Sequence, residues 1–127
     1  MLIDFYDFGR IKIDGKFYER DVVIFPDRVF SPWIKKTGHY IDAEELSLIP
    51  DLLKDNPELV IIGTGYDGVM RVAPDVEEFF RTNPVRNEVS NGTKGIEVII
   101  QKTIDAWKTY NETSKNKKVV ALFHLTC

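Results

Sequence analysis

The sequence predicts an α/β fold with a mixed, partly parallel sheet and helices, preceded by an antiparallel β unit at the N-terminus. Three observations support this prediction. Short apolar runs separated by turn signals fill the first forty residues, as in antiparallel strands. Strands alternate with helices from residue 42 onward, which favours parallel pairing. The runs 59–62 and 119–123 are apolar at successive positions, which is typical of strands buried on both faces.

Composition places the chain among ordinary soluble globular proteins. It has 127 residues, 43% hydrophobic and 29% charged, and we expect one domain over residues 1–127. The net charge of −3 argues against nucleic acid as a partner, and one cysteine with two histidines favours neither a disulfide scaffold nor structural zinc. No apolar run approaches the roughly 20 residues of a membrane span, and no basic secretory signal opens the sequence. We therefore expect a cytoplasmic protein with no membrane partner.

The N-terminal β unit is predicted from alternation and turns. An opening strand begins at Ile3, and a second strand over 11–13 runs into Asp14-Gly15, a strong hairpin signal. The return begins at 17–18, and a third strand over 21–25 is followed by apolar residues at 29–30. The order predicts a β-meander.

The first helix has a specific start signal at Asp42. This residue is an N-cap candidate, and Glu45 three positions later completes a capping box. Ile41 and Leu46 occupy the positions of a hydrophobic staple. Pro50 lacks the amide that a helix interior requires, so we expect a kink or two short helices.

The remaining elements follow from periodicity and turn chemistry. A strand is expected over 69–72, a helix from Pro74 to about Arg81, a surface loop over 82–95 and a strand over 96–100. Thr103 is expected to cap a helix that carries Ile104, Trp107 and Tyr110 along one side.

The run from Gly63 to Gly68 matches the dinucleotide pattern G-x-G-x-x-G. A dinucleotide site needs a helix directly after these glycines, whereas the sequence predicts a strand there. A tight turn with positive φ therefore explains the glycines better. Exposed amides at Thr64 and Gly65, with Arg71 nearby, could still hold a small anion, and these residues form one candidate ligand site.

The histidines and the cysteine are the other candidates for chemistry. His39 lies just before the capped helix and joins the candidate ligand-binding residues, although a solvated loop histidine is the plainer interpretation. Strand alternation places His124 and Thr126 on one face and Cys127 on the other, which excludes a local Cys–His dyad. A dyad of Cys127 with His39 would require the fold to bring them together. We predict no catalytic residue, no metal site and no cofactor.

Charge is distributed unevenly along the chain. Residues 40–80 carry ten acids and two bases, whereas residues 101–127 carry five bases and two acids. Such an asymmetry could steer a partner, and solvated helix faces are the alternative explanation.

Several segments in this order resemble the Mth-nine-three-eight domain family. The segments are Phe8-Gly9-Arg10, Ile13-Asp14-Gly15-Lys16, Asp21-Val22-Val23-Ile24, Gly38-His39, 57–65, Tyr110-Asn111 and 121–127. The resemblance covers nearly the whole chain. It implies a three-layer fold with a mixed central sheet, helices and an additional β layer. The chain departs from the family pattern at Pro50 and in the longer loop 82–95.

The resemblance implies no settled reaction, and better-described relatives point to protein partners and assembly roles. We therefore expect a non-enzymatic protein-interaction or assembly module with an unidentified protein partner, able to form a homo-oligomer. The alternative is a small anionic-ligand-binding domain, or an unrecognised enzyme, centred on the turn Gly63-Thr64-Gly65.

Overall fold

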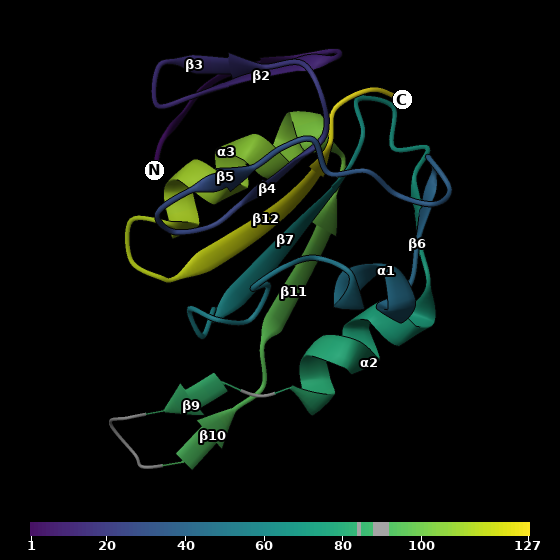
Figure 1. Ribbon diagram of the computed structural model, residues 1–127. Helices are drawn as coiled ribbons and strands as arrows, with labels where there is room; N and C mark the ends of the chain where they lie inside the picture. Colours follow the sequence, from purple (N-terminus) through teal and green to yellow (C-terminus); the bar gives the residue numbers. More distant parts are fainter. Residues whose placement is uncertain (84, 88–91) are drawn as a thin grey trace.

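A five-stranded mixed sheet forms the middle layer of the fold (Figure 1). The computed structural model describes residues 1–83, 85–87 and 92–127. The strand order in this sheet is β11-β7-β12-β4-β5. The strands are β11 (Glu97–Gln101), β7 (Leu59–Thr64), β12 (Val119–His124), β4 (Val22–Ile24) and β5 (Val29–Phe30). β11 and β12 pair with β7 in parallel, and β4 pairs antiparallel with both β12 and β5, so the predicted mixed sheet is confirmed.

Two hydrophobic cores lie on opposite faces of this sheet. All six residues of β7 and of β12 are buried, as their apolar runs predict. Because side chains alternate along a strand, Ile61 packs into one core and Ile62 into the other. The central sheet thus separates two outer layers.

The first outer layer combines the N-terminal sheet with α3 (Thr103–Thr113). The strands β1 (Ile3–Asp7), β2 (Arg10–Ile13) and β3 (Lys16–Tyr18) pair antiparallel in sequence order. On α3, Tyr110 is buried, and Ile104 and Trp107 pack against the same core, which confirms the predicted apolar side of this helix.

The predicted meander is wrong beyond the return over 17–18. The strand expected over 21–25 forms β4, and with β5 it joins the central sheet. Val22, Val23 and Ile24 are all fully buried. A strand that is apolar on both faces can bury both of them in a sheet between two layers. In a meander, one face would be exposed to water.

The second outer layer contains α1 (Ala43–Ser47) and α2 (Pro74–Thr82), with β6 (Tyr40–Ile41) paired in parallel with β8 (Arg71–Val72). The Glu45 amide donates to the Asp42 carboxylate at 3.0 Å, which confirms the predicted N-cap. The Glu45 carboxylate instead accepts from the Lys36 amide at 2.7 Å, so the reciprocal half of the capping box is absent. The helix ends before Pro50, and residues 50–55 form turns rather than a second helix.

Three further predictions need correction. Lys102 occupies the N-cap position of α3, and Thr103 is the first helical residue, because its hydroxyl bonds to the neighbouring turn and strand instead. Of the strand expected over 69–72, only β8 forms. The loop expected over 82–95 contains the antiparallel pair β9 (Val85–Asn87) and β10 (Gly92–Lys94). Residues 84 and 88–91 of that predicted loop lie outside the described residues.

No helix among the described residues combines the length and the apolar character needed to cross a membrane.

Candidate functional site

Polar side chains from distant parts of the chain meet at one end of the central sheet. The strands β7, β11 and β12 run in parallel, so their carboxyl ends lie together, a common place for ligand sites in α/β sheets. β4 runs antiparallel to β12, and this direction brings Asp21, just before β4, beside His124 at the end of β12. The segment after β5 supplies Lys35.

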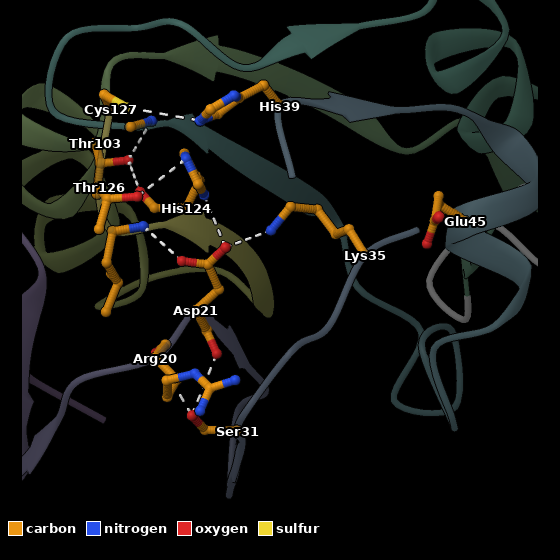
Figure 2. Close-up of polar contacts among 12 residues, drawn as sticks. Arg20, Asp21, Ser31, Lys35, His39, Glu45, Thr103, His124, Thr126 and Cys127 are labelled. Atoms are coloured by element: carbon orange, nitrogen blue, oxygen red, sulfur yellow. Dashed lines mark hydrogen bonds and ion pairs between the residues drawn. The ribbon is translucent and has the colours of Figure 1, made fainter. Parts of the chain in front are cut away.

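Asp21 is the centre of this cluster (Figure 2). One of its carboxylate oxygens accepts from His124 Nδ1 at 2.7 Å and from the Lys35 ammonium, and the other accepts from the Leu125 amide at 2.8 Å. Burial by itself raises the pKa of Asp21. The hydrogen bonds from His124 and Lys35, the charge of Lys35 and the Leu125 amide together outweigh burial and lower this pKa below its ordinary value.

The two basic partners of Asp21 are removed from solvent. The Lys35 side chain is 3% exposed, and its ammonium lies 4.4 Å from the centre of the Trp33 ring. The His124 side chain is 6% exposed. Buried charges require paired and hydrogen-bonded partners, and here two bases share a single carboxylate.

The other ring nitrogen of His124 points along the strand toward Thr126. The distance from Nε2 to the Thr126 hydroxyl oxygen is 3.4 Å, so these two residues share one face, as the alternation predicts. The ring of His39 packs edge-to-face on that of His124, with centres 5.4 Å apart. His39 Nε2 also lies 3.6 Å from Cys127 Sγ. The fold thus brings together the one Cys–His pair that sequence alternation left open.

A cavity of about 250 Å³ opens beside this cluster. Its lining residues are Glu19, Arg20, Asp21, Pro32, Trp33, Ile34, Lys35, Gly38, His124 and Thr126. A second hollow of about 220 Å³ lies next to it and shares the wall formed by Pro32, Trp33 and Ile34. We call the first the polar cavity and the second the apolar groove.

The glycine-rich turn is closed by the C-terminal segment rather than opened toward solvent. The Gly65 amide donates to Thr103 Oγ1 at 2.9 Å, and the Tyr66 amide donates to the Thr126 carbonyl at 2.7 Å. A Cβ at Gly65, where φ is +102°, would lie 2.5 Å from the Thr126 carbonyl oxygen and 2.7 Å from that of Cys127. The positive φ agrees with the predicted tight turn, and the Gly65 amide already has a protein acceptor.

The four candidate ligand residues lie on neighbouring segments, and the Gly65 amide already donates to Thr103. The Thr64 hydroxyl donates to the Gln101 carbonyl at the end of β11, at 3.2 Å. Arg71 is exposed, and its backbone amide donates to the His39 carbonyl at 2.8 Å. Of the four, His39 packs against the Asp21 cluster, through its contact with His124.

Sequence reasoning missed Asp21, Lys35 and the role of His124. Asp21 and His124 are 103 residues apart, and no local pattern links them. The sequence did contain one signal. Asp21 directly precedes a fully apolar strand, and an acid in that position lies at the edge of a core. In the described part of the chain, no group of three His, Cys, Asp or Glu side chains is arranged to hold a metal ion.

Comparisons with known proteins support the fold over its full length. A conserved hypothetical protein, PH1505 from Pyrococcus horikoshii OT3, is 30% identical, with all of both chains covered and a TM-score of 0.78. A structure named MT938 is 28% identical, covers 99% of this chain and 98% of its own, and has a TM-score of 0.73. A protein described as an outer membrane protein from Bartonella henselae shares the fold at 20% identity, covering 98% of this chain and 94% of its own, with a TM-score of 0.69.

No curated protein matches the chain. The profile of one family, described as a protein of unknown function (DUF498/DUF598), matches residues 3–124. Together with the match to MT938, this result confirms the resemblance to the Mth-nine-three-eight domain family. The chain therefore belongs to this conserved family of unknown function.

Proposed function

We propose that this protein is an interaction module that binds an apolar, basic segment of a partner protein in the apolar groove. The groove is lined by Phe30, Pro32, Trp33, Ile34, Glu45, Leu48 and Ile49. The observation that carries the proposal is the convergence of three exposed apolar side chains on this one hollow. They are Phe30, Ile34 and Leu48, with exposed fractions of 37%, 72% and 59%.

These three side chains come from separate segments. Phe30 ends β5, Ile34 lies in the following loop, and Leu48 directly follows α1. Single exposed apolar residues are common, whereas several around one hollow are typical of an interaction site. The buried Trp33 and Ile49 give the groove a fixed apolar floor.

Two exposed aromatic residues on another surface have a cation of the same chain over their rings. On the N-terminal sheet, Phe5 is 37% exposed and Phe17 48%. The Arg10 guanidinium lies over both rings, 5.5 and 5.2 Å from their centres. Because these two rings already contact a cation within the protein, they are less available to a partner. The apolar groove is therefore the better candidate for docking.

Charge around the groove specifies the chemistry of the partner. Glu45 lines the groove and is 5% exposed, so it is the acid that a base of the partner would meet there. A segment with apolar residues and at least one lysine or arginine would complement this surface.

A displayed peptide library panned against the immobilised protein tests the proposal. We expect enriched peptides to combine apolar residues with a basic residue. Their affinity should fall roughly tenfold or more in Ile34→Asp, because a buried charge would face the apolar segment. Phe17→Asp is the control, since it places the same charge at another exposed apolar residue on a different surface.

Three outcomes would contradict the proposal. Enriched peptides could bind Ile34→Asp and the wild type equally, or they could be acidic rather than basic. A dimer in sedimentation that dissociates in Ile34→Asp would instead assign the groove to a second copy of this chain.

A further inference from the structure

We propose that the polar cavity binds a small organic monocarboxylate, held by Lys35, His124 and Thr126. This inference concerns a second site and does not depend on the proposed docking of a partner protein. It is carried by charge, by hydrogen-bonding capacity and by the shape of the cavity.

The charge balance of the cluster favours one added negative charge. Asp21 contributes one negative charge and Lys35 one positive charge, and they neutralise each other. When His124 holds protons on both ring nitrogens, the cluster has a net charge of +1. Glu19 and Arg20 also line the cavity with opposite charges that cancel. A monoanion completes this balance, whereas a dianion such as sulfate would leave one negative charge without a partner.

The cluster also has donors that the protein does not use fully. A lysine ammonium has three N–H groups, and the bond to Asp21 uses one of them. His124 Nδ1 is bonded to Asp21, whereas Nε2 contacts the Thr126 hydroxyl at 3.4 Å. That distance is longer than ordinary hydrogen bonds, so a ligand oxygen can replace this weak contact. Lys35, His124 and Thr126 then offer donors to the two oxygens of a carboxylate.

The walls of the cavity fit the remainder of such a molecule. Pro32, Trp33 and Ile34 give the cavity an apolar part of its lining beside the charged cluster. A volume of about 250 Å³ lies below the roughly 300 Å³ at which cavities begin to hold drug-sized ligands. An acid with a short apolar body therefore matches both the polar and the apolar side.

The test uses butyrate as the probe and butyramide as its neutral counterpart. Both are titrated into the isotope-labelled full chain at about pH 6, and amide and indole N–H signals are followed by NMR. We expect saturable shifts at the Trp33 indole and the Thr126 amide with butyrate. Butyramide should cause no such shifts, because it lacks the charge.

Adjacent lysines provide a matched pair of variants. Lys35→Met removes the buried ammonium, and Lys36→Met removes an exposed one that pairs with Glu44. Butyrate affinity should fall roughly tenfold or more in Lys35→Met and change less than about twofold in Lys36→Met. Leu48→Asp, which alters the apolar groove alone, should leave butyrate binding unchanged.

The proposal fails if butyrate and butyramide shift the same signals equally, or if neither shifts them at millimolar concentration. It also fails if sulfate, a dianion at this pH, binds as tightly as butyrate, or if Lys36→Met weakens binding as much as Lys35→Met. Should Lys35→Met not fold, Thr126→Val removes one donor without removing a buried charge. Its butyrate affinity should fall roughly threefold or more, and unchanged affinity would overturn the assignment.

Discussion

At the scale of single residues, Asp21 determines whether the polar cluster exists. Its carboxylate accepts hydrogen bonds from Lys35, His124 and the Leu125 amide, and its side chain is 15% exposed. Asp21→Asn removes the charge that compensates two buried bases, so we expect the free energy of unfolding to fall by about 3 kcal/mol. Chemical denaturation of both proteins at pH 7 measures this loss. Glu44→Gln, which breaks an exposed pair with Lys36, is the control and should have a far smaller effect.

The lowered pKa of Asp21 also predicts a dependence of stability on pH. A carboxyl group with a lower pKa in the folded than in the unfolded protein stabilises the fold above the unfolded value, about 3.9. That contribution disappears as the pH falls through the lower, folded pKa. The gap in unfolding free energy between wild type and Asp21→Asn should therefore narrow as the pH falls from 5 to 2. A gap that stays constant over this range would contradict the pKa shift.

At the scale of elements, the turn after β7 fastens the C-terminal segment to the sheet. Gly65 has a φ of +102°, and a Cβ there would lie 2.5 Å from a backbone oxygen of Thr126. Gly65→Ala should therefore lower the free energy of unfolding by about 3 kcal/mol and perturb the NMR signals of His124 and Thr126. Gly38→Ala is the matched control, since nothing lies within 4 Å of its added Cβ. Equal stability of the two variants would show that the turn is not under this constraint.

The same turn should not bind dinucleotides. No helix follows Gly68 directly, because the chain continues into β8, and the Gly65 and Tyr66 amides already donate within the protein. A pyrophosphate therefore finds neither a helix N-terminus nor free amides at these two residues. Calorimetric titration with NAD, NADP and FAD should give no measurable heat of binding. Micromolar affinity for any of them would overturn this interpretation of the glycines.

The sequence predicted those elements that are determined by residues close together in the chain. The Asp42 cap needs only residues three positions apart, and the buried strands β7 and β12 follow from their own composition. The sheet that β4 joins was not predictable in this way, because apolar residues alone do not identify their partner strand. The Asp21–His124 contact was missed for the same reason, since it exists only once β4 and β12 are paired.

At the scale of the whole molecule, both cores depend on the same sheet. Strands β7, β12 and β4 contribute residues to the cores on both faces. Loss of either outer layer would expose apolar side chains of this shared sheet to water. We therefore predict that residues 1–127 unfold as one cooperative unit, as expected of a single domain.

The two tryptophans provide a probe for each side of the sheet. Trp33 is buried in the core that contains α1 and α2, whereas Trp107 lies on α3 and packs against the opposite core. In Trp107→Phe the remaining fluorescence comes from Trp33 and reports on the core beside α1 and α2. In Trp33→Phe it comes from Trp107 and reports on the core beside α3. Within each variant, the urea midpoint from fluorescence should equal the midpoint from far-ultraviolet circular dichroism, because the two layers cannot separate without exposing β7 and β12. A fluorescence transition at clearly lower urea in either variant would mean that one outer layer unfolds independently of the rest.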